Sequence, residues 1–323
     1  PLGHLTGGGT MANLEALWIG GRLDPGKTVL ASSQAHYTHG RISEVLGLPF
    51  RPVEVDAAGR MDLEALEAEL AKGDAGTVVA TIGNTGIGAV DPLPGIIDLA
   101  ERFGVRVHAD AAYGGYFGLA GTLSDKVAAT YARLKDADSI VVDPHKHGLQ
   151  PYGCGCVLFK DPAVGRFYKH GSPYTYFSST ELHLGEISLE CSRAGAAAVA
   201  LWSTHRLLPP VAGGEFADGL ESCLAAARDF HSRLTAGEHY TPLFEPDLDI
   251  VVYAPRAASA TEVSRRSREI FDIAANKDLH LALMALPVAL VAEHMPDFEV
   301  DTETVTCMRS VFMKPEHADW MAR

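Results

Sequence analysis

The 323-residue chain is poor in cysteine and in positive charge. Its five cysteines are an odd number without finger-like spacing, which fits a reducing compartment, so we expect a cytoplasmic protein. Cys154 and Cys156 lie two apart on an expected strand and lack partners for a metal site, so core packing is the better interpretation and no metal is expected. With 27 basic against 41 acidic residues, the net charge of −14 argues against a nucleic-acid groove.

Long apolar runs are also missing. The most apolar stretch, LALMALPVALVA over 281–292, is too short to span a bilayer and is broken by Pro287. It favours the core of a C-terminal domain, and no membrane segment is expected. The chain opens at Pro1 on a glycine-rich loop. Because domains seldom begin on a functional loop, we expect a further N-terminal region in the whole protein.

The chain does contain a regular alternation of apolar strands and amphipathic helices. Short links between such elements predict an α/β fold, with a mostly parallel sheet covered by helices on both faces. The strands are expected near 28–31, 50–55, 77–82, 105–110 and 140–142, and the clearest helices between them near 62–70 and 93–103.

A cluster of prolines and glycines at 209–214 predicts a division of the chain. The large domain would comprise residues 1–208. A smaller C-terminal α+β domain, residues 209–323, would contain helices near 216–234 and 261–277 and strands near 249–254 and 304–313.

Two strand ends carry residues suited to one chemistry. In SIVVDPHKHG, residues 139–148, Lys146 follows a short apolar strand, and apolar surroundings favour the neutral amine that Schiff-base formation requires. In VRVHADAAYGGYF, residues 105–117, Asp110 ends another strand among small residues that leave room for a flat ligand. A buried carboxylate needs a cationic partner. The pair therefore predicts pyridoxal phosphate, held covalently by the lysine and at its pyridine nitrogen by the carboxylate.

The segments HADAAYGGYF and DPHKHG together resemble the pyridoxal-phosphate-dependent group II decarboxylases. Three further stretches, GHLTGGGTMANLEALW, ISLECSRAGAAAVALWSTHRLLP and TVTCMRSVFMKPEH, resemble the bacterial tyrosine decarboxylases of that family. The resemblance implies a homodimeric fold-type I enzyme that converts an L-amino acid, aromatic by preference, to its amine and carbon dioxide. Those decarboxylases are much longer, and their N-terminal segment helps to form the dimer and part of the pocket.

The resemblance also implies contacts to the cofactor. A glycine-rich turn before a helix offers backbone N–H groups to an anion, and Gly8, Gly9 and Thr10 match the family's phosphate loop. His36 matches the histidine that stacks on the cofactor ring, and His39 is the weaker candidate for that role. The other implied contacts, of which the first two are equally consistent with a plain turn, are Asn84, Thr85, Ala112 and His145.

Three residues after the lysine are implied to act on the substrate. Arg193 matches an arginine that pairs with the substrate carboxylate in related enzymes, although a helix-capping role is the alternative. Tyr174 and Tyr176 lie 28 and 30 residues after Lys146, where the family has a loop tyrosine that returns a proton to the product. We assign Tyr174 as that acid and Tyr176 to the substrate pocket.

Two other functions stay open at this point. A carbon–carbon lyase of the sphingosine-phosphate lyase type shares the lysine and aspartate motifs, but its substrate has no carboxylate for Arg193. A cofactor-binding but inactive fragment, or an accessory subunit, would retain the cofactor residues without turnover.

Overall fold

The computed structural model describes residues 1–169, 188–190 and 195–321. Its larger sheet has seven strands in the order β1-β7-β6-β5-β4-β2-β3. Five neighbouring strands run parallel, in the sheet order β3, β2, β4, β5 and β6. β7 pairs antiparallel with both β6 and β1. The bounds are β1 (Leu2–Thr6), β2 (Thr28–Ser32), β3 (Phe50–Val53), β4 (Ala75–Thr81), β5 (Arg106–Asp110), β6 (Ser139–Val142) and β7 (Gly155–Phe159).

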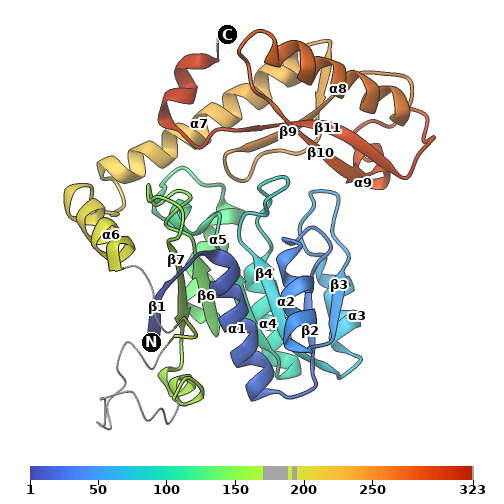
Figure 1. Cartoon of the computed structure of the whole chain (residues 1–323). Helices are drawn as coiled ribbons and strands as arrows, with labels where there is room; N and C mark the ends of the chain where they lie inside the picture. Colours follow the sequence, from blue (N-terminus) through green and yellow to red (C-terminus); the bar gives the residue numbers. More distant parts are fainter. Residues whose placement is uncertain (170–187, 191–194, 322–323) are drawn as a thin grey trace.

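Helices cover both faces of this sheet, as the alternation predicted (Figure 1). On β2, Val29 and Ala31 pack with α1 and α2, whereas Leu30 points to the opposite face and joins the core under α3 and α4. This alternation follows from the two-residue period of a strand. The bounds are α1 (Gly9–Leu23), α2 (Thr38–Leu46), α3 (Leu63–Leu70), α4 (Leu93–Phe103) and α5 (Asp125–Arg133).

Local signals explain where these helices begin and end. The side chain of Asp62 accepts a hydrogen bond from the backbone N–H of Ala65 and so caps α3. α4 ends at Gly104, whose φ of 67° lies in the left-handed region that favours glycine. The prediction of a mostly parallel α/β fold is confirmed.

The C-terminal part has a second, antiparallel sheet in the order β10-β11-β9-β8. The predicted core segment 281–292 divides at Pro287 into an edge strand, β10, and the short helix α9. The boundary between domains at 208/209 stays a prediction. The bounds are β8 (Tyr240–Pro242), β9 (Ile250–Pro255), β10 (Ala282–Pro287), β11 (Thr304–Val311), α6 (Gly195–Leu207), α7 (Glu215–Ala236), α8 (Ala260–Ala275) and α9 (Val288–Ala292), with 3₁₀ turns η1 (Gly115–Leu119), η2 (Leu134–Asp136), η3 (Pro162–Phe167) and η5 (Pro315–Trp320).

The second sheet lies over the carboxyl ends of the large sheet's strands (Figure 1). Leu248, just before β9, packs so closely that a Cβ at Gly83 or Gly114 would lie 2.6 or 3.1 Å from its side chain. Arg60 and Asp247 add a bidentate ion pair across this junction, with Nε and Oδ2 2.9 Å apart. The two parts therefore share one continuous apolar core.

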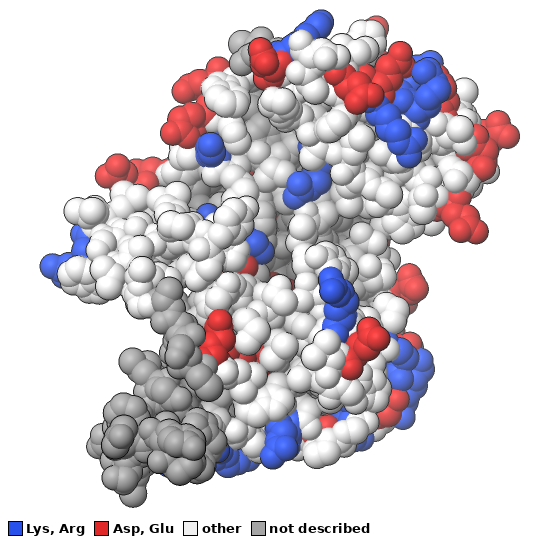
Figure 2. Space-filling model, viewed as in Figure 1, with Lys and Arg blue, Asp and Glu red and all other residues white. Residues whose placement is uncertain are grey.

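The surface carries charges of both signs. Figure 2 shows a hollow between the two parts and adjoining basic and acidic side chains over the C-terminal part. Ion pairs lie along α8, such as Arg265 Nε with Glu262 Oε2 at 2.7 Å. Exposed pairs of this kind contribute little to stability. Within the described ranges, no helix is both long and apolar enough to cross a lipid bilayer.

Candidate active site

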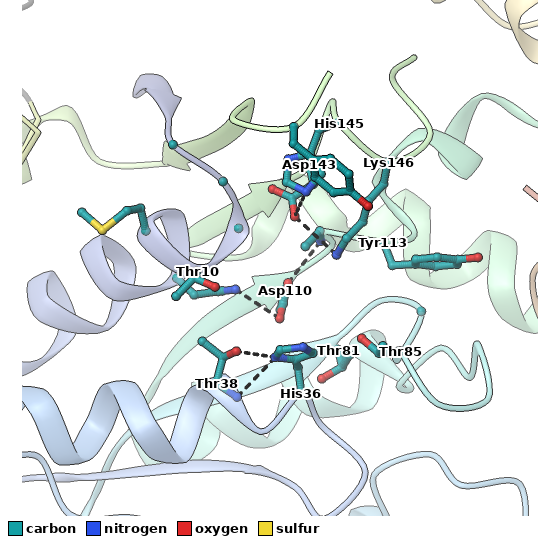
Figure 3. A pocket seen from close by; sticks show the side chains of 18 of the residues that line it. Thr10, His36, Thr38, Thr81, Thr85, Asp110, Tyr113, Asp143, His145 and Lys146 are labelled. Atoms are coloured by element: carbon teal, nitrogen blue, oxygen red, sulfur yellow. Dashed lines mark hydrogen bonds and ion pairs between the residues drawn. The ribbon is translucent and has the colours of Figure 1, made fainter. Parts of the chain in front are cut away.

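A cavity of about 480 Å³ lies where the parallel strands of the large sheet end. Ligand sites of open α/β sheets form at this edge because the loops after several strands meet there. Figure 3 shows side chains from α1, the head of α2 and the ends of β4, β5 and β6 converging on it. The predicted site residues that line the cavity are Gly8, Gly9, Thr10, His36, Thr85, Asp110, Ala112, His145 and Lys146.

Lys146 extends into the cavity from the turn after β6. Its Nζ lies 3.3 Å from Oδ2 of Asp143, and its side chain is 29% exposed. The turn is tied down because the N–H of Lys146 donates to the carbonyl of Asp143, and the N–H of Asp143 donates to the carbonyl of Ala112. The amine is thus fixed in position yet accessible to a ligand.

Asp110 ends β5 and is buried beneath the cavity. Its Oδ2 accepts hydrogen bonds from His39 Nε2 at 2.8 Å and from Asn13 Nδ2 at 3.3 Å, and its Oδ1 accepts one from the N–H of Ala112. Burial alone would raise the pKa of Asp110, but the hydrogen bond and charge of His39 hold that pKa well below its usual range. Asp110 is therefore a carboxylate at neutral pH.

Two histidines at the head of α2 have different surroundings. His36 lines the cavity, and its Nδ1 accepts a hydrogen bond from the N–H of Thr38 at 3.2 Å. Burial lowers the pKa of His36, which favours the neutral ring. His39 is fully buried under the cavity and bonds to Asp110. The geometry therefore leaves His36 as the candidate for stacking on a ring and gives His39 a role that the sequence interpretation missed.

The glycine-rich turn before α1 is shaped by close backbone approaches. Gly8 has a φ of 142°, and a Cβ at Gly155 would lie only 2.4 Å from the carbonyl carbon of Gly8. A Cβ at Gly9 would lie 2.4 Å from Oδ2 of Asp143. Glycine at these positions brings the helix N-terminus, and the N–H groups of its first turn, up to the cavity.

Some predicted residues lie elsewhere or are not described. Asn84 is buried but does not line the cavity, because its Oδ1 accepts from the N–H of Ile87 at 2.8 Å and so closes its own turn. This placement differs from the expected cofactor contact. Tyr174, Tyr176 and Arg193 lie outside the described residues.

Sequence interpretation also missed two residues that fix the cavity walls through contacts with the C-terminal part. Arg309, on β11, donates from Nη2 to the carbonyl of Thr85 at 2.6 Å and from Nε to that of Gly86 at 2.8 Å, so it fixes one wall. Tyr113 lines the cavity and donates its hydroxyl to Asp249 at 2.6 Å. No local pattern marks Arg309, because its partners lie more than two hundred residues earlier.

The residues present fit pyridoxal phosphate. An accessible amine on Lys146, a buried carboxylate on Asp110 and a glycine cradle that a Cβ would fill lie around one cavity. These groups match the aldehyde, the pyridine nitrogen and the phosphate of that cofactor in turn.

Comparison with known proteins agrees with this donor set. Residues 22–255 match the family described as "Pyridoxal-dependent decarboxylase conserved domain". A "Probable L-tyrosine/L-aspartate decarboxylase" of Methanothermobacter thermautotrophicus is 28% identical over 83% of this chain and 72% of that protein. An "Aspartate 1-decarboxylase" of Aliivibrio fischeri is 28% identical over 84% of this chain but only 55% of that protein.

A solved structure shows the same fold. The crystal structure of "Oryza sativa TDC with PLP and tryptamine" superposes with a TM-score of 0.82 at 19% identity, over 98% of this chain and 68% of that one. Both of these curated relatives carry aspartate in their names and only one carries tyrosine, so the finer likeness to bacterial tyrosine decarboxylases is not established. The fold, the cofactor site and the family match agree, and the chain belongs to the pyridoxal-phosphate-dependent amino acid decarboxylases.

Proposed function

We propose that this chain removes the α-carboxyl group of an aromatic L-amino acid, tyrosine or a relative, with pyridoxal phosphate bound through Lys146. The observation that carries the proposal is the meeting of Lys146 and Asp110 at one cavity, from the ends of the adjacent strands β6 and β5. The bound cofactor supplies an electron sink for the bond that breaks.

The protein's own groups prepare this chemistry. Asp110, kept ionised by His39 and Asn13, holds a proton on the pyridine nitrogen. His36 covers one face of the cofactor ring as a neutral imidazole, since a charged one would oppose the positive ring. Gly8, Gly9 and Thr10 receive the phosphate at the start of α1, and Ala112, Thr85 and His145 line the remaining wall.

The substrate contacts are proposed from the family resemblance. Arg193 pairs with the α-carboxylate, Tyr176 borders the side-chain pocket and Tyr174 returns a proton after carbon dioxide leaves. Tyr37 and Tyr152 line the described cavity and suit an aromatic side chain. L-Aspartate is the second candidate substrate, because both relatives named above carry aspartate in their names.

We also propose a cytoplasmic homodimer. Tyr152 at the cavity and Trp202 on α6 are 93% and 66% exposed, which is unusual for large aromatic side chains. A second copy of the chain would cover such surfaces. Sedimentation of the purified protein, with and without cofactor, measures its oligomeric state directly.

Amine release tests the proposed activity. The purified protein is incubated with pyridoxal phosphate and, in parallel, with L-tyrosine, L-aspartate and their D-isomers, and amines and carbon dioxide are quantified. Equal rates of both products from an aromatic L-amino acid support the proposal. Preference for L-aspartate would change the substrate class, and aldehyde release from a phosphorylated amino alcohol would favour a carbon–carbon lyase. A visible cofactor band without turnover of any substrate would indicate an inactive fragment or accessory subunit.

A further inference from the structure

Asp143 is a buried carboxylate, and one of its two oxygens has no hydrogen-bond donor among the described residues. The residue is 2% exposed, and its Oδ1 accepts no hydrogen bond from any residue in the described ranges. Its Oδ2 lies 3.3 Å from Lys146 Nζ and 3.6 Å from His145 Nε2. An unsatisfied buried acceptor is uncommon and calls for a partner that is not among these side chains.

The unsatisfied carboxylate faces the start of α1. A Cβ at Gly9 would lie 2.4 Å from Oδ2 and 3.0 Å from Oδ1 of Asp143. The first turn of α1 reads Gly-Thr-Met-Ala and so adds no anion of its own. Figure 3 shows Asp143 on the same side of the cavity as Lys146 and His145. The proposed function places the cofactor phosphate at this helix start, where it would meet Asp143. In the same glycine turn, Glu190 Oε2 accepts a hydrogen bond from the N–H of Gly7 at 2.7 Å, so a second carboxylate is also near.

A phosphate monoester can relieve this conflict because it binds a proton near pH 6. Burial raises the pKa of Asp143, while the charges of Lys146 and His145 lower it and that of Asp110 on β5 raises it. Cys154 and Cys156 also interact with the charge of Asp143. Burial raises the pKa of each thiol, so both are neutral. The amine of Lys146 lies beside Oδ2, so it leaves Oδ1 without a donor among the described residues whether or not the lysine bonds to a cofactor.

We propose that this site takes up a phosphate monoester together with one proton, shared between the phosphate and Asp143, and therefore selects phosphate over sulfate. Sulfate has the same shape and charge as the phosphate dianion but carries no proton at neutral pH. It would meet the carboxylate without a hydrogen bond. The inference rests on the proposed function, since it assumes that the glycine turn at Gly8 and Gly9 holds the phosphate.

The test uses pyridoxine 5′-phosphate, which has no aldehyde and cannot bond to Lys146. Its binding to the cofactor-free full chain is measured by titration calorimetry at pH 8 in two buffers with different ionisation enthalpies. The wild type is expected to take up about one proton more than the Asp143→Asn variant, whose amide has nearly the same shape. Between about pH 7.5 and 8.5, wild-type affinity should fall roughly tenfold relative to that of the variant.

A competition experiment gives a second test of the shared proton. Inorganic phosphate and sulfate compete with pyridoxine 5′-phosphate for the wild-type chain, and phosphate should compete at least about tenfold better, as one extra hydrogen bond to a charged group predicts. In Asp143→Asn this preference should largely disappear. The same proton uptake in both proteins, or equal competition by sulfate and phosphate in the wild type, would overturn the inference.

Failure of the proposed function has a different signature. If pyridoxal phosphate gave no borohydride-reducible bond to Lys146, the cofactor assignment itself would be wrong. If that bond formed but pyridoxine 5′-phosphate bound without extra proton uptake, the cofactor site would stand and only the shared proton would be rejected.

Discussion

His147 and Asp249 form a fully buried pair between the lysine turn and the C-terminal sheet, with Nε2 and Oδ2 2.9 Å apart. The other ring nitrogen, Nδ1, donates to the carbonyl of Tyr113 at 3.1 Å. Both ring nitrogens are therefore within hydrogen-bond distance of a partner, and the ring is fixed on both sides. Asp249 also accepts the hydroxyl of Tyr113. One carboxylate thus connects the C-terminal sheet to the neighbour of Lys146 and to a cavity wall.

Replacing Asp249 should therefore destabilise the fold strongly. Asp249→Asn removes the carboxylate from a buried, hydrogen-bonded pair, and breaking such a pair typically costs about 3–5 kcal/mol of unfolding free energy. Urea unfolding monitored by circular dichroism measures the change. Asp229→Asn is the control, because Asp229 pairs with Arg233 on the exposed surface of α7 and should change stability by less than about 0.5 kcal/mol. Similar losses in both variants would argue against the buried pair.

Lys146→Ala should abolish the covalent link to the cofactor and all turnover while leaving the fold intact, since the side chain is partly exposed. Borohydride reduction followed by peptide mapping checks this. The label should appear on Lys146 in the wild type and on no peptide in the variant. Lys126→Ala, on α5, is the control and should be labelled like the wild type. A label on another lysine would exclude Lys146 as the attachment site.

Asp110→Asn should slow decarboxylation by about 10²–10³-fold, because it removes the charge that keeps the pyridine nitrogen protonated without changing the side chain's shape. The amide oxygen can still accept from His39 and Asn13, but the amide NH2 then faces the N–H of Ala112, so the melting temperature should also fall. Steady-state kinetics and a thermal melt are compared on the same samples. Near wild-type turnover would show that Asp110 is not needed to keep the pyridine nitrogen protonated.

Stability should fall between pH 6.5 and pH 4 because of His108. Burial lowers the pKa of His108 to about 4, below the unfolded value of about 6.5, so in this range the unfolded chain binds the extra proton. Stability is then fully present above the unfolded pKa and decreases by roughly 3 kcal/mol as the pH falls to 4. Urea unfolding at several pH values measures the slope.

His108→Gln provides the comparison for that slope. The amide of glutamine can replace the imidazole Nε2, which bonds to Asn13, but it does not titrate. The variant should lose most of the pH dependence over this range. An unchanged slope would assign it to other groups.

The sequence was sufficient for features that depend on local pattern. Strand and helix periodicity predicted the parallel sheet. Residues at or shortly after strand ends, such as Asp110 and Lys146, could be expected at one edge because parallel strands end together. The cofactor followed from that pair. The sequence favoured His36 over His39 for the cofactor ring, but only the fold shows that His39 bonds to Asp110.

Long-range contacts and ambiguous short patterns account for the rest. Arg309 and Asp249 reach the cavity walls from the C-terminal sheet, and no spacing in the chain relates them to Thr85 or Tyr113. Asn84 follows a strand, as cofactor contacts do, but an asparagine equally suits a turn, and here it closes one. The apolar run 281–292 is too short for periodicity to separate strand from helix, and it contains both.

The first strand covers one side of β7, a strand that otherwise lies next to the edge of the large sheet. β1 pairs along the whole length of β7, from Leu2 with Phe159 to Thr6 with Gly155. Proteolytic removal of residues 1–6 would leave one side of β7 with unpaired backbone groups, and such an edge is a template for intermolecular strand pairing. A chain clipped at Gly7 would therefore keep every cavity-lining residue named above yet tend to aggregate.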